Sequence, residues 1–506
     1  CAVAIRRGQY CRAAPPVDCG PENLRTAACA GAADHTASAV PRHGPALDWI
    51  GTARGVASPV LWWVRQDFRL RDNPALIAAA HSGAVIPVYV LDDETPGDWR
   101  IGAAQRWWLH HSLAALGASL RERGSRLILR RGAAADVIAA LMRETGAAEV
   151  HATCEYEPWW RAADAALGST LTLHDGNRIA PPELVTTGAG TQFKVFGAFW
   201  KALQAQLPPP EPLPVPDAIT SPVAWPESDR LDDWNLLPTR PDWATGFADW
   251  TPGENGAAQA LADFAGEVVD YDTARDLPAV EGTSRLSPHL HFGEISAGQV
   301  WHALGGSGQG VTTFRKELAW RDFAAGLTLA LPHYAEENGR PAYDRIPWRN
   351  APDDFRAWQQ GRTGYPIVDA GMRQLWATGW MHNRVRMIVA SFLVKHLLID
   401  WREGARWFWD TLVDADYGNN SVNWQWVAGT GTDANMWGRI MAPLSQSEKF
   451  DAADYIREWV PELRDLPDDA IHDPDAAGCR PEDYPAKIIG HREGRERALA
   501  AGRLAR

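Results

Sequence analysis

Short apolar runs alternate with helical patterns over residues 58–153, and this alternation limits the possible folds more than any other feature of the sequence. The runs predicted to be strands are Val60–Val64, Ala84–Leu91, Leu127–Leu129 and Glu149–Ala152. Between them, Asn73-Pro74 is predicted to begin one helix, and Gln105–Arg123 and Ala133–Thr145 are predicted to form two more. Strands separated by helices form a parallel sheet with helices on its faces. We therefore expect a Rossmann-like α/β domain in the N-terminal part.

The rest of the chain follows other patterns. Residues 1–57 are rich in Ala, Pro, Gly and Arg without periodicity, and we expect a disordered extension there. Residues 58–190 form the expected α/β domain, 191–255 a connector rich in proline and acid, and 481–506 a C-terminal tail. From 256 to 480 the apolar spacing is helical; Pro366, for example, is predicted to begin a helix that Gly379 ends. The expected architecture is α/β followed by all-α.

Several common sites and protein classes are excluded by what the sequence lacks. The turn Arg65–Arg69 after the first strand contains no glycine, and the chain has no Gly-Lys dipeptide, so neither a dinucleotide-binding turn nor a P-loop is expected. The six cysteines form no C-x-x-C pair, which argues against a zinc or iron–sulfur site and favours a reducing, cytoplasmic compartment. The apolar stretch Leu76–Leu91 is too short and too interrupted to span a bilayer. No metal and no membrane partner are expected.

Charge and aromatic content are distributed unevenly. The net charge is −13, yet residues 361–410 carry 7 Lys or Arg against 4 Asp or Glu, while residues 211–280 carry 14 acids and 3 Arg. An acidic chain can therefore still present a locally basic face to DNA. The 26 tryptophans outnumber the 10 tyrosines and 13 phenylalanines together, a surplus that core packing alone does not explain.

Three clusters could carry chemistry. Thr283, Ser284 and Ser287 precede Pro288, and hydroxyls at a helix start suit a phosphate, although from this segment alone N-capping by Ser287 is the simpler interpretation. The segment 414–426 contains Asp414 and Asp416, the amides Asn419 and Asn420, and the indoles Trp424 and Trp426. These side chains suit a polar heterocycle, but a loop followed by a Trp-rich core helix is an equally good interpretation. The segment Trp380–Met387 places arginines beside an amide and a thioether. This composition suits a DNA-binding surface, and a solvated helix end is the alternative interpretation.

Five motifs occur in order and resemble one family. They are GTSRLSPHLHFGEIS (282–296), ELAWRDF (317–323), GRTGYPIVDAGMRQLWATGWMHNRVRM (361–387), LLIDWREG (397–404) and NNSVNWQW (419–426). Together they resemble the photolyase/cryptochrome flavoproteins from about Leu61 to Leu466, most nearly the bacterial enzymes that repair cyclobutane pyrimidine dimers. The resemblance implies an antenna domain, a helical FAD-binding domain, and light-driven electron transfer from reduced FAD to the dimer and back.

The resemblance also implies roles for individual residues. The residues expected to hold the FAD diphosphate are Tyr271, Thr283, Ser284, Arg285, Leu286 and Ser287. Asp414 and Asp416 are expected to bond the flavin–ribityl region, Arg386 to pair with Asp414, and Asn420 to face flavin N5. An asparagine at that last position favours a flavin kept fully reduced, as in photolyases.

The lesion pocket and the electron path follow from the same resemblance. The expected pocket residues are Glu317, Trp320, Asn383, Arg384, Met387 and Trp426. Trp320 and Trp426 would stack on a flipped dimer, Glu317 would bond base carbonyls if protonated, and Arg384 would bind backbone phosphate. Asn383 and Met387 stand where related (6-4) photolyases carry histidines. Trp424, Trp401 and Trp348 match the family's photoreduction chain.

The function expected from the resemblance is dimer repair on UV-damaged DNA by a monomer without an obligate protein partner. The alternatives are a signalling cryptochrome and a flavin oxidoreductase that works without light. The antenna would be either methenyltetrahydrofolate or 8-hydroxy-deazaflavin; Glu157 lies near the expected place of a folate-binding acid and tips the choice towards folate.

Overall fold

The computed structural model describes residues 57–434 and 437–504 of the 506-residue chain. The extension expected over 1–57 lies outside the described residues except for its last position. Gly55–Arg506 form one compact unit.

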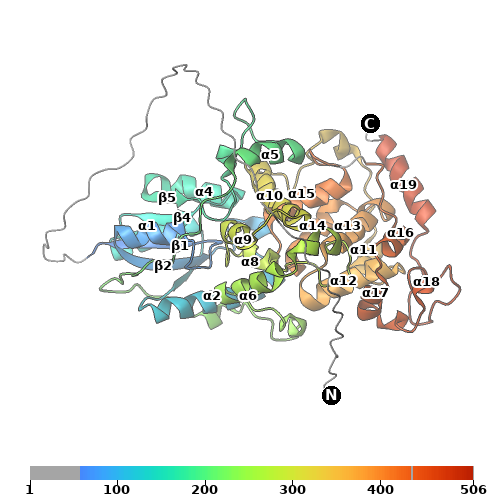
Figure 1. The fold of residues 1–506 in the computed structure, drawn as a ribbon, viewed down its shortest axis with the longest axis horizontal. Helices are drawn as coiled ribbons and strands as arrows, with labels where there is room; N and C mark the ends of the chain where they lie inside the picture. Colours follow the sequence, from blue (N-terminus) through green and yellow to red (C-terminus); the bar gives the residue numbers. More distant parts are fainter. Residues whose placement is uncertain (1–56, 435–436, 505–506) are drawn as a thin grey trace, which may run out of the picture. The chain divides into compact units, whose positions relative to one another are not determined.

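The N-terminal part of this unit is a five-stranded parallel sheet with helices on both faces (Figure 1). The order along the chain is β1 (Pro59–Val64), α1 (Pro74–Ser82), β2 (Ala84–Leu91), α2 (Ala103–Glu122), β3 (Ile128–Arg131), α3 (Ala134–Thr145), β4 (Val150–Thr153), α4 (Pro158–Leu167) and β5 (Leu171–His174). The order across the sheet is β3-β2-β1-β4-β5, and every pairing is parallel. The expected α/β fold is confirmed.

Successive side chains of β1 point to opposite faces of the sheet, and their contacts show which helices cover each face. Trp62 packs in one cluster with Leu76 of α1 and Leu109 of α2. Trp63 points to the other face and packs in a cluster with Ile138 of α3 and with α4. Both indoles are fully buried, as expected for β1, the central strand of a sheet covered on both faces.

The second part is helical, as predicted. Its helices are α5 (Phe196–Leu203), α6 (Glu254–Ala265), α7 (Tyr271–Ala274), α8 (Ser287–His291), α9 (Ala297–Ala303), α10 (Gln309–Ala330), α11 (Pro352–Gln359), α12 (Pro366–Thr378), α13 (Asn383–Ser391), α14 (Trp401–Thr411), α15 (Tyr417–Ala428), α16 (Pro443–Lys449), α17 (Ala453–Trp459), α18 (Asp468–Ile471) and α19 (His491–Leu504). Short 3-10 turns join many of these helices, and a π-helical turn, η9 (Phe392–His396), follows α13. Residues 191–255 contain α5, and residues 481–504 contain α19, which packs on η9.

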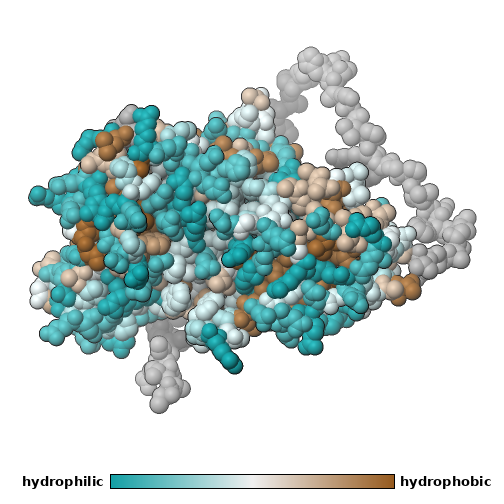
Figure 2. Space-filling model, turned by 180° about the vertical axis from the view of Figure 1, so that it is seen from behind, coloured by the Kyte–Doolittle hydropathy of each residue, from teal (hydrophilic) through white to brown (hydrophobic). Residues whose placement is uncertain are grey.

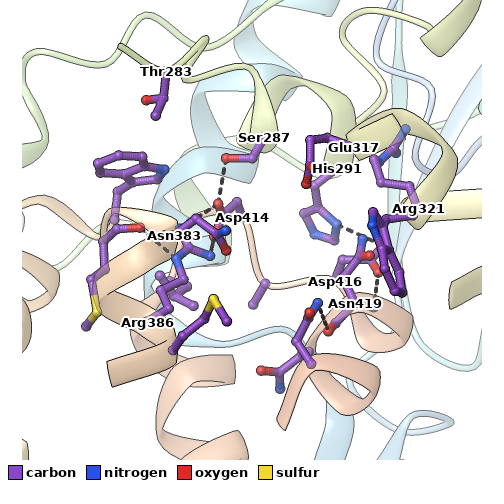
Figure 3. A pocket seen from close by; sticks show the side chains of 18 of the residues that line it. Thr283, Ser287, His291, Glu317, Arg321, Asn383, Arg386, Asp414, Asp416 and Asn419 are labelled. Carbon is purple, nitrogen blue, oxygen red and sulfur yellow. Dashed lines mark hydrogen bonds and ion pairs between the residues drawn. The ribbon is translucent and has the colours of Figure 1, made fainter. Parts of the chain in front are cut away.

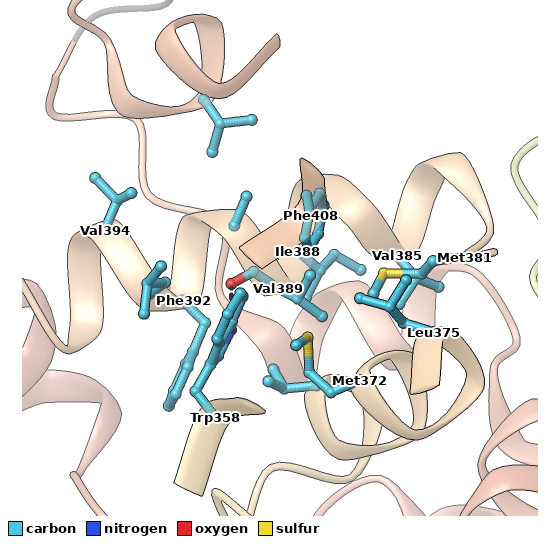
Figure 4. Packing of buried hydrophobic residues seen from close by; sticks show 14 of the residues in the cluster. Trp358, Met372, Leu375, Met381, Val385, Ile388, Val389, Phe392, Val394 and Phe408 are labelled. Carbon is cyan, nitrogen blue, oxygen red and sulfur yellow. Dashed lines mark hydrogen bonds between the residues drawn. The ribbon is translucent and has the colours of Figure 1, made fainter. Parts of the chain in front are cut away.

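Aromatic and aliphatic side chains pack together in the helical core (Figure 4). Trp358 of α11 is fully buried, stacks between Phe355 and Phe408, and donates its indole N–H to the Val389 carbonyl at 3.0 Å. An indole of this kind fixes α11 against α13, because burial and a satisfied N–H act together. By holding α11 against α13, this packing gives both helices a rigid support.

The sheet part and the helical part are joined directly. The backbone N–H of Ala103, which begins α2, donates to the Asp410 carboxylate at 2.9 Å, and Trp409 donates its indole N–H to the Arg100 carbonyl at 2.8 Å. A Cβ on Gly102 would lie 2.2 Å from the Trp409 carbonyl oxygen, so only glycine permits this approach.

The face of the molecule drawn in Figure 2 is mainly hydrophilic. Figure 2 shows apolar side chains as small areas separated by polar ones. Of the helices that the structure describes, none combines the length and the apolar character needed to cross a membrane.

Candidate functional site

A cavity of about 500 Å³ lies in the helical part (Figure 3). The segments that surround it include α7, α8, α10, α13 and α15. The predicted site residues that line it are Tyr271, Thr283, Ser284, Arg285, Ser287, Glu317, Trp320, Asn383, Arg384, Arg386, Met387, Asp414, Asp416, Asn420, Trp424 and Trp426. Leu286, Trp348, Trp401 and Glu157 are not among its lining residues. Segments more than 150 residues apart therefore meet in one chamber.

One wall carries an ion pair with an attached hydroxyl. The guanidinium of Arg386 donates to both carboxylate oxygens of Asp414, at 3.0 and 2.9 Å, and Ser287 donates its hydroxyl to the same carboxylate at 2.6 Å. The pairing of Arg386 with Asp414 is as expected. Capping by Ser287 is not observed, because this hydroxyl is used by Asp414 and α8 has no side-chain cap. The fork geometry fixes the cation at the pocket wall.

A second charged group lies across the cavity from this pair in Figure 3. Asp416 accepts the backbone N–H of Asn419 at 2.7 Å and so caps α15. Burial alone would raise the pKa of Asp416, but the neighbouring His291 imidazole and the Arg178 guanidinium lower it below the ordinary value. The Asp416 carboxylate is therefore ionised at neutral pH, with His291 Nδ1 3.9 Å away.

The side chain of Arg285 has a different environment from the one expected of a phosphate ligand. Its guanidinium lies over two indoles, 4.4 Å from the ring centre of Trp250 and 5.1 Å from that of Trp380. Its backbone has a φ of 50°, a left-handed conformation that costs energy for a residue with a side chain. Leu286 is fully buried. Thr283 and Ser284 line the cavity, and the Ser284 hydroxyl accepts the backbone N–H of Leu286 at 3.3 Å.

Two further ion pairs lie at the lesion-pocket residues. Glu317 pairs with Arg275, and Arg384 pairs with Asp276. Glu317 was expected to bond base carbonyls if protonated, and in the structure its side chain is held by the Arg275 guanidinium. Arg275 and Asp276 were missed, although they follow Tyr271 by only four and five positions. In sequence they are an ordinary charged pair, and only the fold places them opposite Glu317 and Arg384.

The wall formed by Trp320 is supported from outside the predicted set. Phe196, at the start of α5, stacks on Trp320 with ring centres 3.7 Å apart and planes only 5° from parallel. The backbone N–H of Phe196 donates to the Asp433 carboxylate at 2.9 Å, which fixes the start of α5. Residues 191–255 were expected to form a connector, and no motif in that segment singled out Phe196.

The three tryptophans predicted for electron transfer differ in their surroundings. Trp424 lines the cavity and packs edge-on against Phe408, with ring centres 5.0 Å apart. Trp401 is fully buried on the neighbouring α14 and donates its N–H to the Asn338 amide oxygen at 3.0 Å. Trp348 is half-buried, with its ring centre 5.8 Å from that of Trp437. Their role in electron transfer stays a prediction.

Glu157 lies in a buried charge cluster behind the cavity. Its carboxylate accepts the backbone N–H of Tyr156 at 3.1 Å and is 3% exposed. Burial, together with the nearby negative charge of Asp416, raises the pKa of Glu157. The neighbouring Glu155 is buried as well, and burial raises its pKa to about 8 despite Arg178. Glu157 therefore lies in a buried cluster near Asp416 rather than at an open surface.

Metal and disulfide chemistry find no structural support in the part of the chain that the structure describes. No group of three His, Cys, Asp or Glu side chains there could hold a metal ion, and Cys154 and Cys479 are free thiols.

The chain is similar in sequence and in fold to known proteins. A family model described as the FAD binding domain of DNA photolyase matches residues 314–503, and one described as DNA photolyase matches residues 60–217. The chain is 48% identical to a deoxyribodipyrimidine photo-lyase of Agrobacterium fabrum, over 88% of this chain and 97% of that protein. It is 37% identical to cryptochrome-1 of Arabidopsis thaliana, over 86% of this chain and 69% of that protein. A solved bacterial class III photolyase from Agrobacterium tumefaciens has a TM-score of 0.85 and 46% identity, covering 90% of this chain and 98% of that one.

Proposed function

The chain belongs to the photolyase/cryptochrome family, and from this premise we propose that it is a deoxyribodipyrimidine photo-lyase that splits cyclobutane pyrimidine dimers in DNA. One observation carries the proposal. A single cavity combines the Arg386–Asp414–Ser287 wall with a mouth made of Trp320, Trp426 and charged side chains. A flavin and an extruded pyrimidine dimer need these two kinds of surface side by side.

The residues of the inner chamber fit FAD. The hydroxyls of Thr283 and Ser284 are available to a diphosphate, and the Arg386–Asp414 pair and Asp416 are available to the polar edge of a flavin. His291 Nδ1 is buried and has no hydrogen-bond partner among the described residues, so a bound polar group would satisfy it. When bound, FAD supplies the electron that light moves onto the dimer and that returns after the cyclobutane bonds split.

The side chains at the mouth would hold the lesion. Trp320 and Trp426 offer flat faces, and stacking contributes about 1–3 kcal/mol per base, which offsets part of the cost of extruding the dimer. Asn383, the exposed first residue of α13, presents an amide to the base edges. Glu317, held by Arg275, would hydrogen-bond the edge of an extruded base.

The similarity to cryptochrome-1 leaves a light-signalling function as the second candidate. Two facts favour the enzyme. Identity to the Agrobacterium fabrum photo-lyase is 48%, against 37% to cryptochrome-1. Asn420 stands at the position proposed to face flavin N5, and its amide N–H donates to the Ala405 carbonyl at 3.0 Å, which fixes its orientation.

We further propose an antenna chromophore, with methenyltetrahydrofolate favoured over 8-hydroxy-deazaflavin, and a monomer that works where the cell keeps its DNA, in the cytoplasm. Glu157 gives the folate proposal no added support, because its carboxylate is buried beside Asp416. Extraction of the chromophores from the purified protein, followed by their absorbance spectra, distinguishes the two candidates.

The direct test illuminates the purified holoprotein, with its flavin reduced, in the presence of duplex DNA that contains a thymine dimer. We expect dimers to disappear in near-UV or blue light and to persist in the dark. Persistence in the light, with flavin bound and reduced, would favour the signalling candidate. Loss in the dark would reject light-driven repair.

A further inference from the structure

Two consecutive residues after α7 form ion pairs with two different helices at the mouth of the cavity. Arg275 pairs with Glu317 on α10, and Asp276 pairs with Arg384 on α13. The side chains of Arg384 and Asp276 are 21% and 35% exposed, so their ion pair lies at the rim, within reach of a bound strand.

Arg384 has few other polar partners. Its guanidinium lies 4.5 Å from the ring centre of Phe450, and its Nη1 is 3.8 Å from the sulfur of Met387. Its Nε is buried without a hydrogen-bond partner among the described residues. Asp276 is therefore the anion that holds Arg384 in the absence of DNA.

A carboxylate and a backbone phosphate present the same kind of acceptor to a guanidinium. We propose that Asp276 is a built-in competitor of the DNA backbone for Arg384, and that binding of the damaged strand exchanges the Asp276 carboxylate for a phosphate. This inference rests on the proposed function and adds to it a residue that sets affinity for DNA without itself binding DNA.

The neighbouring pair gives the exchange a fixed frame. Arg275 lies 5.3 Å from the ring centre of Tyr271 as well as against Glu317, so the end of α7 stays attached to α10 when Asp276 releases Arg384. After repair, the same carboxylate is in place to take Arg384 back, which favours release of the repaired strand.

The test compares equilibrium binding of dimer-containing duplex DNA, in the dark, by the wild-type holoprotein and the variant Asp276→Asn. The amide keeps the shape of the side chain and removes its charge. We expect binding to tighten roughly two- to fivefold, the range of a partly exposed ion pair. We also expect a steeper dependence on salt, because no carboxylate is left beside the bound phosphate to retain a cation.

Two controls make the result specific. Asp272→Asn removes an equal charge from an exposed position in the preceding helix, α7, and should change binding less. In the Arg384→Ala background, Asp276→Asn should have no effect, because the competition requires Arg384. Flavin absorbance of each variant reports that the pocket is intact.

Other outcomes contradict the inference in distinguishable ways. Weaker or unchanged binding by Asp276→Asn, with wild type binding normally, would make Asp276 a positioning residue or irrelevant and overturn the exchange. Equal tightening by Asp272→Asn, or tightening that persists without Arg384, would mean that binding improves only because the protein carries less negative charge. A wild-type protein that does not bind damaged DNA would overturn the proposed function together with this inference.

Discussion

At the scale of single residues, the lesion wall depends on a side chain that the sequence did not single out. Phe196 covers one face of Trp320 with nearly parallel rings, 3.7 Å apart. A stacked pair contributes about 0.5–1.5 kcal/mol beyond burial, and it also fixes the plane of the second ring. The other face of Trp320 is then presented to the cavity in one orientation.

We expect Phe196→Ala to weaken binding of dimer-containing DNA about two- to tenfold, because Trp320 loses its support. Phe196→Tyr keeps the ring and should restore binding. Equilibrium binding and repair yield at saturating DNA are both measured: a positioning role lowers affinity more than yield at saturation.

The matched control is Phe193→Ala, since Phe193 contacts Phe199, with ring centres 6.3 Å apart, and no contact with Trp320 is recorded for it in the described part of the chain. If Phe193→Ala weakens binding as much as Phe196→Ala, the effect comes from α5 as a whole and the positioning role is wrong.

At the scale of elements, the helix that carries Arg384 and Arg386 ends in an unexpected way. The apolar spacing from Val385 to Leu397 predicts a continuous helix, but α13 ends at Ser391 and a π-helical turn follows. This turn buries Lys395 completely; its amine donates to the Ala428 carbonyl at 2.6 Å and lies 3.6 Å from the ring centre of Trp437. Burial lowers the pKa of Lys395 well below its ordinary value.

The sign of the resulting pH dependence is fixed by linkage. Below about pH 10.5 the unfolded chain carries the Lys395 proton, while the native state loses it at lower pH. The free energy of unfolding therefore rises with pH across that interval, by at most about 1.4 kcal/mol per pH unit. We expect Lys395→Met to remove this rise in urea unfolding measured at pH 7 and pH 9.

Lys201→Met, at an exposed position of α5, is the control and should leave the rise unchanged. An equal rise in wild type and Lys395→Met would show that Lys395 keeps its proton in the native state, paired with the Trp437 ring, and would contradict the prediction.

Local signals explain which elements the sequence could predict. Asn73 caps α1 through its side chain, and Gly379 ends α12 in a left-handed conformation, so both boundaries are encoded within a few residues. The strand β5 was missed because Leu171–His174 is short and only half-buried, without the apolar run of the other strands. The π-helical turn was missed because its spacing resembles that of an α-helix.

At the scale of the whole molecule, the residues of the candidate site were also predictable only where the sequence carries a local signal. Motifs that resemble the family identified most residues that line the cavity, because each motif keeps its residue types in order. Phe196, Arg275 and Asp276 were missed because their roles arise only from contacts with distant segments. Glu317 was identified, but its ion pair with Arg275 was not, because the two residues lie on separate segments.

The electron path proposed through the helical part also belongs to this scale. It leads from Trp424 at the cavity through the buried Trp401 to the half-buried Trp348. We expect Trp348→Phe to block light-driven reduction of oxidised flavin, because the path loses its outer end, while repair by chemically reduced protein stays nearly intact. Flavin absorbance under illumination measures the first, and dimer loss the second. If photoreduction survives, the path does not end at Trp348.

The central claim is that dimers are split in this cavity, and a variant that fills its mouth tests this most directly. Asn383 is the exposed first residue of α13 and lines the cavity, while Asn255 is exposed near the start of α6 and lies outside it. The measurement is dimer loss per absorbed photon by holoproteins with equal flavin content. The account predicts normal repair by wild type and Asn255→Trp, and repair reduced at least tenfold in Asn383→Trp. Undiminished repair by Asn383→Trp would contradict it.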